Sequence, residues 1–256
     1  LLNASASYDI NKDNNLKFTL HSSSRLPNFN YLLYQSEYLN YNWDNSKAFE
    51  KERISSLKAE FNSSTWGNLM LKYSNIDNYT YFAPVSENVI EDGLENAYIK
   101  PLQENNGISY LKVKYEKEFK VGMFALNNTV MYQNVTQDDQ VMNLPQIVTR
   151  NTLYFSSDVF KKAMYLQTGV TFKYFTSYYM NAYNPILGEF YVQNKEELGG
   201  YPLLDFFINA RIKQTRIYLK AEHFNSAFSG YNYYAAPDYP YRDFVIRFGL
   251  VWNFFS

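Results

Sequence analysis

The sequence predicts an all-β protein, specifically an antiparallel up-and-down transmembrane β-barrel or a portion of one. Apolar and polar residues alternate with a period of two along much of the chain, which places them on opposite faces of extended strands. Aromatic residues make up 19% of the chain, with 26 Tyr and 20 Phe, and aromatic rings gather at both rims of membrane barrels. The mean hydropathy of -0.43 fits a barrel in which half of each strand faces water.

The alternating segments of the first half can be followed in chain order. In the first, Leu2 and Tyr8 lie on one face while Asn3 and Asp9 lie on the other. The following segments repeat this arrangement. Their apolar sides carry Leu16, Phe18 and Leu20, then Leu57, Ala59 and Phe61, then Leu69, Leu71 and Tyr73, then Leu111, Val113 and Tyr115, then Phe124, Leu126, Val130 and Tyr132.

The second half continues the pattern, most clearly near the C-terminus. The apolar sides there carry Leu153 and Phe155, then Leu166, Val170 and Phe172, then Leu204, Phe206, Ile208 and Ile212, then Ile217 and Leu219, then Phe244, Ile246, Phe248, Leu250, Trp252 and Phe254. Between turns the segments exceed the roughly 5 to 6 residues of globular strands and suit the roughly 9 to 11 needed to cross a bilayer. A soluble β-sandwich also alternates, but strand length and aromatic content favour the membrane barrel.

Composition excludes several classes of protein. The 24 Lys and Arg nearly balance the 25 Asp and Glu, giving a net charge of -1, which is too neutral for a nucleic-acid-binding protein. A hydrophobic content of 46% argues against a disordered chain. There is no Cys and there are only two His, so we expect no disulfide, no metal site and no cofactor. The sequence contains no run of about 18 apolar residues, so no transmembrane helix is expected.

The connections between segments predict the topology. Short connections near 11–14, 62–65, 119–120 and 213–215, and an intermediate one at 156–163, alternate with long polar ones. The long connections are 24–50, 78–107, 134–145, 179–202 and 225–243. Outer-membrane barrels have short periplasmic turns and long outer loops. The chain is therefore expected to end on the periplasmic side.

This alternation requires two apolar patches, Ala97–Leu102 and Leu187–Gln193, to be parts of loops, for instance short strands outside the membrane. If they spanned it instead, the chain would hold up to about 13 strands. With eleven main strands, the chain cannot be a complete bacterial barrel, which has an even number. We therefore expect residues 1–256 to form one partial barrel domain from which earlier strands are missing.

The polar side of the segments is expected to line a wet lumen, because charged groups are costly in hydrocarbon. The candidate pore-lining residues are Lys58, Glu60, Lys112, Lys114, Glu116, Lys173, Asp205, Arg211, Lys213, Lys220, Glu222 and Arg247. Both signs of charge occur. This mixture suggests a transverse field across a pore rather than strong selectivity for anions or cations.

Two further features of the sequence bear on function. His21 lies on the polar side of its segment and His223 on the apolar side near the rim, and neither has a partner suited to catalysis, so no enzymatic activity is expected. The last long connection is rich in Tyr. Its tyrosines are Tyr231, Tyr233, Tyr234, Tyr239 and Tyr241. They form either an outer-loop aromatic surface that stacks on sugars or peptides, or a cluster that packs on itself and orders the loop.

The C-terminal region resembles a known family. Tyr201–Phe224 reads YPLLDFFINARIKQTRIYLKAEHF, and Gly230–Phe255 reads GYNYYAAPDYPYRDFVIRFGLVWNFF. A Tyr-Pro entry, a strand, a tight basic turn, a returning strand, a Tyr/Pro loop and a final aromatic strand resemble the Putative porin family of Bacteroidetes-type bacteria. The resemblance implies a bacterial outer-membrane barrel that conducts small solutes. Phe255 would serve as the barrel-assembly signal, although Ser256 follows it.

The sequence therefore predicts a porin-like outer-membrane channel for passive diffusion of small solutes. The expected partners are outer-membrane lipid and lipopolysaccharide, the barrel-assembly machinery and small solutes, with no nucleic acid. One alternative is the barrel portion of a TonB-dependent active-transport receptor. A second alternative is a soluble aromatic-rich β-protein that binds glycans.

Overall fold

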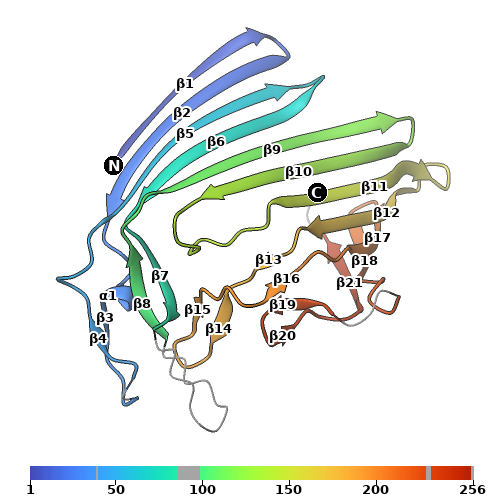
Figure 1. Cartoon of the computed structure of the whole chain (residues 1–256). Coiled ribbons are helices and arrows are strands. Elements are labelled where there is room, and N and C mark those ends of the chain that lie inside the picture. Colours follow the sequence, from blue (N-terminus) through green and yellow to red (C-terminus); the bar gives the residue numbers. More distant parts are fainter. Residues whose placement is uncertain (39, 86–98, 229–231, 255–256) are drawn as a thin grey trace.

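Eleven long strands form one antiparallel sheet, whose course can be followed in Figure 1. The computed structural model describes residues 1–38, 40–85, 99–228 and 232–254. In spatial order the strands are β1 (Leu2–Asn11), β2 (Asn14–Arg25), β5 (Glu52–Ser63), β6 (Gly67–Asp77), β9 (Ile108–Val121), β10 (Phe124–Thr136), β11 (Ile147–Val159), β12 (Met164–Phe175), β17 (Leu203–Ile212), β18 (Thr215–Glu222) and β21 (Val245–Trp252). Each strand pairs with its neighbour in this order, so the topology is an up-and-down meander. The eleven predicted segments are thereby confirmed.

Short and long connections alternate around this meander. All the short turns lie at one rim and all the long connections at the other, as predicted. One predicted turn was misplaced: β9 continues through Phe119 and Lys120 to Val121, and the chain reverses at Gly122 and Met123. Gly122 adopts a φ of 61°, a left-handed conformation that glycine reaches without strain. The alternation of Phe119 and Lys120 alone did not reveal this position, because both residues suit a strand.

The long connections carry small elements of their own. They are α1 (Phe29–Leu32) and the strand pairs β3 (Leu33–Tyr34) with β4 (Trp43–Asp44), β7 (Tyr79–Pro84) with β8 (Ile99–Glu104), β13 (Tyr178–Tyr179) with β16 (Glu197–Leu198), β14 (Ala182–Asn184) with β15 (Glu189–Tyr191), and β19 (Tyr234–Ala236) with β20 (Tyr239–Pro240). The patches at Ala97–Leu102 and Leu187–Gln193 thus supply short hairpin strands, as predicted. Ala97 and Tyr98 lie outside the described residues. Among the described residues, no helix is long and apolar enough to cross a bilayer.

The cross-strand registers sort the side chains of the sheet into two continuous faces. We call the polar face the side that carries Ser7, Lys17, Lys58, Lys72, Lys112, Thr129, Thr152, Thr171, Asp205, Lys220 and Arg247. The apolar face is the opposite side. Its exposed residues include Leu20, Leu57, Leu71, Leu126, Leu153, Val170, Ile217, Leu219, Ile246, Phe248 and Leu250.

Within the described residues, few apolar side chains of the eleven long strands are buried. Phe248 is 82% exposed and Trp252 is 56% exposed, whereas a soluble sandwich would bury such residues between two sheets. Most of the buried apolar residues instead lie in the long connections, such as Phe82, Met180 and Tyr233. An apolar band this wide and open is suited to contact with lipid tails. The soluble glycan-binding alternative is therefore disfavoured.

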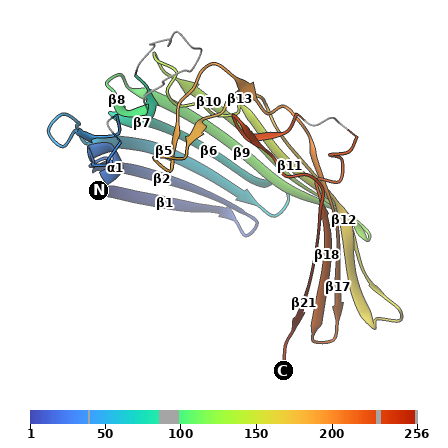
Figure 2. The ribbon, with the colours of Figure 1, turned by 90° about the horizontal axis from the view of Figure 1, so that it is seen from below.

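The sheet is strongly curved, so that β1 and β21 lie at the two ends of an arc (Figure 2). A hollow of about 500 Å³ lies on it, lined from β9 to β18 by polar-face residues such as Glu118, Arg150 and Asn209. This hollow identifies the polar face as the concave one. In the described sheet β1 and β21 do not pair with each other, so the sheet is open.

Gly169 in β12 permits a close approach between neighbouring strands. It lies opposite Tyr154, and a Cβ at Gly169 would overlap the Leu153 carbonyl and the Tyr154 backbone. We expect Gly169→Ala to cost about 1–3 kcal/mol, because the backbone must shift. Gly249→Ala is the matched control, since the atoms nearest to its Cβ would be the outer end of the Tyr218 ring, which can swing away, and not backbone. Urea unfolding in lipid vesicles measures both; equal costs would contradict this explanation.

Candidate functional site

The polar face brings together nearly all the predicted pore-lining residues. Cross-strand registers place eleven of the twelve on it: Lys58, Glu60, Lys112, Lys114, Glu116, Lys173, Asp205, Arg211, Lys220, Glu222 and Arg247. The exception is Lys213, which lies in the turn between β17 and β18 with a φ of 51°. Lys213 therefore belongs to the short-turn rim and not to the sheet surface.

Some charges on this face are paired along a single strand. Lys58 Nζ lies 2.9 Å from Glu60 Oε2, and Lys114 Nζ lies 2.8 Å from Glu116 Oε1. Residues two apart on a strand point to the same face, so each pair follows directly from the alternation. Such partly exposed pairs contribute only about 0–1 kcal/mol to stability. Their main effect is to neutralise individual charges locally.

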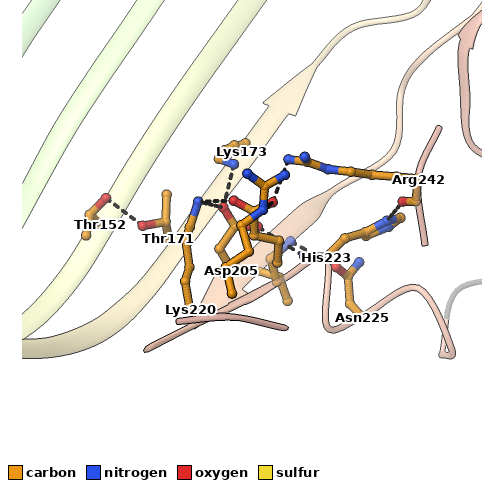
Figure 3. Close-up of polar contacts among 11 residues, drawn as sticks. Thr152, Thr171, Lys173, Asp205, Lys220, His223, Asn225 and Arg242 are labelled. Carbon is orange, nitrogen blue, oxygen red and sulfur yellow. Dashed lines mark hydrogen bonds and ion pairs between the residues drawn. The ribbon is translucent and has the colours of Figure 1, made fainter. Parts of the chain in front are cut away.

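A larger ion-pair network spans four strands beside the long-connection rim (Figure 3). Asp205 is at its centre and is only 2% exposed. Its Oδ2 lies 2.5 Å from Lys173 Nζ and 3.2 Å from Lys220 Nζ. Lys220 Nζ also lies 2.7 Å from Glu222 Oε1. A buried carboxylate with two ammonium partners is well compensated, because each cation offsets part of its desolvation cost.

Glu222 extends the network into the last long connection. Its Oε2 lies 2.7 Å from Arg242 Nη2 and 3.2 Å from Arg247 Nε. Arg242 lies between β20 and β21, outside the main sheet. The network therefore ties this connection to the concave face of the sheet. Its two carboxylates face four cations, so the local balance is basic.

His223 does not lie on the apolar face, contrary to the sequence-based expectation. It is 1% exposed, and its backbone N–H donates to Asp205 Oδ1 at 3.1 Å. Its Nδ1 lies 2.9 Å from the Arg242 carbonyl oxygen (Figure 3). The strand ends at Glu222, and His223 adopts a φ of 52°. That left-handed turn breaks the alternation and directs the ring into the loop packing.

Among the described residues of the predicted outer-loop aromatic surface, Tyr233 is buried, Tyr234 and Tyr241 are half-buried, and Tyr239 is exposed. Tyr233 is 4% exposed, and its ring centroid lies 4.9 Å from that of Tyr201 and 4.5 Å from that of His223. Tyr241 also packs against His223, and Tyr239 packs against Tyr183 of another connection. The Tyr234 carbonyl oxygen accepts a hydrogen bond from the Tyr201 hydroxyl. Tyr231 lies outside the described residues. The packing alternative therefore fits the described residues better than a stacking surface.

Tyr201 gives this packing a pH dependence. Its hydroxyl donates to the Tyr234 carbonyl oxygen at 2.8 Å, and burial raises its pKa to about 12. The folded protein thus holds this proton more tightly than the unfolded chain, whose Tyr titrates near 10. The stabilising contribution is complete below about pH 10 and is lost as the pH rises towards 12.

We expect Tyr201→Phe to remove a tyrosine that ionises with a midpoint near pH 12. The ultraviolet absorbance of tyrosinate, titrated in the parent and the variant, gives the difference curve. A lost component with a midpoint near pH 10 would contradict the buried hydrogen bond.

Several charged residues on the polar face were absent from the predicted set. They are Asp9, Lys17, Arg25, Glu52, Lys72, Glu118, Lys120, Arg150, Asp158 and Arg216. Lys72 could have been found, because it alternates with Leu71 and Tyr73. Arg150 lies outside the short alternating run around Leu153, so the alternation alone does not assign it to a face. The pairing of β11 with β10 and β12 places it on the polar face. Among the described residues, no group of three or more His, Asp or Glu is placed to hold a metal ion.

Comparison with known proteins identifies the family. The model of the family described as "Putative porin" matches residues 1–256. The chain belongs to this porin family. The match covers the entire chain and not only the C-terminal region that first showed the resemblance. The porin chain is therefore an outer-membrane β-barrel protein. No curated protein matches it.

Solved structures share the fold of this porin chain. The FrpB iron transporter from Neisseria meningitidis matches with a TM-score of 0.62 at 12% identity, covering 97% of this chain and 38% of that one. The copper transporter OprC matches with a TM-score of 0.64 at 11% identity, covering 86% and 32%. The ferric enterobactin receptor PfeA from Pseudomonas aeruginosa, as a G324V mutant, matches with a TM-score of 0.60 at 12% identity, covering 96% and 39%. The chain thus spans less than two fifths of each of these proteins.

Proposed function

We propose that this porin chain forms part of the wall of an outer-membrane channel through which small solutes diffuse passively. The observation that carries the proposal is the separation of the sheet into a continuous, charged concave face and an exposed apolar outer face. In a bilayer this arrangement encloses water on one side and meets hydrocarbon on the other. The function requires no catalytic residue.

The edges of β1 and β21, which do not pair with each other in the described sheet, indicate how the channel wall is completed. Backbone N–H and C=O groups in lipid must be hydrogen-bonded, so an open edge of this length is not stable there. We therefore propose that further strands of the whole protein pair with both edges and close the barrel. Lipid and lipopolysaccharide would surround the apolar face, and the barrel-assembly machinery would insert the chain.

Conductance of the whole protein in a planar lipid bilayer tests the proposed channel. We expect stepwise current increases as single channels insert, with a lifetime long enough to give resolved levels. The control is the same preparation after heat denaturation, which should give no steps. A folded protein that remains silent would contradict the proposal.

A second candidate is the barrel of an active-transport receptor. It is favoured by the shared fold with iron and copper transporters and with a ferric enterobactin receptor. Such a receptor would be silent in the bilayer and would bind one nutrient tightly. Isothermal titration of the whole protein with metal chelates would separate the two candidates.

A further inference from the structure

The polar face as a whole carries an excess of positive charge. Its basic residues are Lys17, Arg25, Lys58, Lys72, Lys112, Lys114, Lys120, Arg150, Lys173, Arg211, Arg216, Lys220 and Arg247. Its acidic residues are Asp9, Glu52, Glu60, Glu116, Glu118, Asp158, Asp205 and Glu222. The whole chain has a net charge of -1. The positive charge is therefore concentrated on the concave face and offset elsewhere.

One part of this excess lacks local compensation. The registers place Lys58, Lys72 and Lys112 directly opposite one another on the adjacent strands β5, β6 and β9. Like charges in direct cross-strand positions destabilise a sheet. Lys58 is paired with Glu60. Within the described part of the chain, by contrast, neither Lys72 nor Lys112 forms an ion pair.

Hydroxyl groups without partners flank these lysines. Ser74 follows Lys72 by two residues on the same face and is only 2% exposed. Thr19 lies directly opposite Lys58. Among the described residues, neither the Ser74 Oγ nor the Thr19 Oγ1 has a hydrogen-bond partner. A buried hydroxyl normally has one, so the Ser74 hydroxyl is a second, independent sign that a ligand belongs here.

We propose that the channel prefers small anions and that Lys72 and Lys112, with Ser74 beside them, form an anion-binding point on its wall. An oxyanion such as phosphate or a carboxylate would accept hydrogen bonds from the two ammonium groups and the hydroxyl. It would also relieve the repulsion between the two lysines. This inference rests on the proposed channel function and names its solute class. It replaces the expectation of little selectivity.

Reversal potentials of the whole protein under a KCl gradient test the preference. We expect the parent channel to be more permeable to chloride than to potassium, so its reversal potential should have the same sign as the equilibrium potential of chloride. The double substitution K72E/K112E should lower the permeability ratio of chloride to potassium several-fold. The matched control K161E/K162E makes the same change in net charge within the turn between β11 and β12, and should leave the ratio nearly unchanged.

Inorganic phosphate tests the binding point itself. Phosphate added to one side should reduce the chloride current of the parent channel, and both S74A and the milder K72Q/K112Q should weaken this block several-fold. Three results would overturn the anion inference alone. They are a conducting parent that prefers cations, an equal change of the permeability ratio in K72E/K112E and K161E/K162E, and a phosphate block that is as strong in S74A and K72Q/K112Q as in the parent. A folded but silent parent would instead contradict the channel function on which it rests.

Discussion

Replacing Asp205 with alanine is expected to destabilise the protein by about 3 kcal/mol, the low end of the cost of breaking a buried ion pair. The substitution leaves Lys173 and Lys220 facing each other without their shared carboxylate. It also removes the acceptor of the His223 backbone N–H. The lysine side chains are about one-third exposed (31% and 34%), and water therefore moderates the loss.

Equilibrium unfolding in urea, with the protein folded in lipid vesicles, measures this effect. Glu116→Ala is the matched control, because Glu116 is also ion-paired on the polar face but its side chain is 43% exposed. The control should cost no more than about 1 kcal/mol. Equal losses for the two variants would show that Asp205 is not the centre of a buried network.

A charge placed on the apolar face should lower the stability of the protein about as much as Asp205→Ala does. The same charge one residue away, on the polar face, should be tolerated. Ile208 and Asn209 are adjacent in β17 and lie on the apolar and polar faces respectively. Ile208→Arg is expected to cost about 2–4 kcal/mol, the penalty for a cation at mid-bilayer depth. Asn209→Arg should change stability by less than about 0.5 kcal/mol, as at other water-exposed positions.

The same unfolding measurement in vesicles compares these two variants. Their charges and sizes are identical, so the difference isolates the environment of each face. If both variants were tolerated, the apolar face would not contact lipid. If both were damaging, the concave face would not be wet.

The strands and their faces could be predicted because the two environments act on every second residue. Leu204, Phe206 and Ile208 alternate with Asp205 and Asn209 under any placement of the neighbouring strands. The rim positions depended on local backbone conformation, which alternation does not encode. Lys213 and His223 both adopt a positive φ and leave the pattern for that reason.

The ion-pair network could not be predicted in the same way. Asp205, Lys173 and Arg242 are far apart in sequence, and their contacts depend on the register between strands and on how the last connection folds back. Likewise, Lys72 was visible on the polar side of its segment, but the run of three lysines across strands emerged only from the pairing of β5, β6 and β9.

A cysteine scan along β17 tests the central claim most directly. The chain has no Cys of its own, so each substitution from 206 to 211, beyond the buried Asp205, gives a single label site. In vesicles containing the whole protein, a charged, water-soluble thiol reagent should label positions 207, 209 and 211. A lipid-soluble quencher should reach labels at 206, 208 and 210. Such a period of two would show that water and hydrocarbon meet opposite faces of one sheet; uniform labelling, or labelling confined to the second set, would contradict the account.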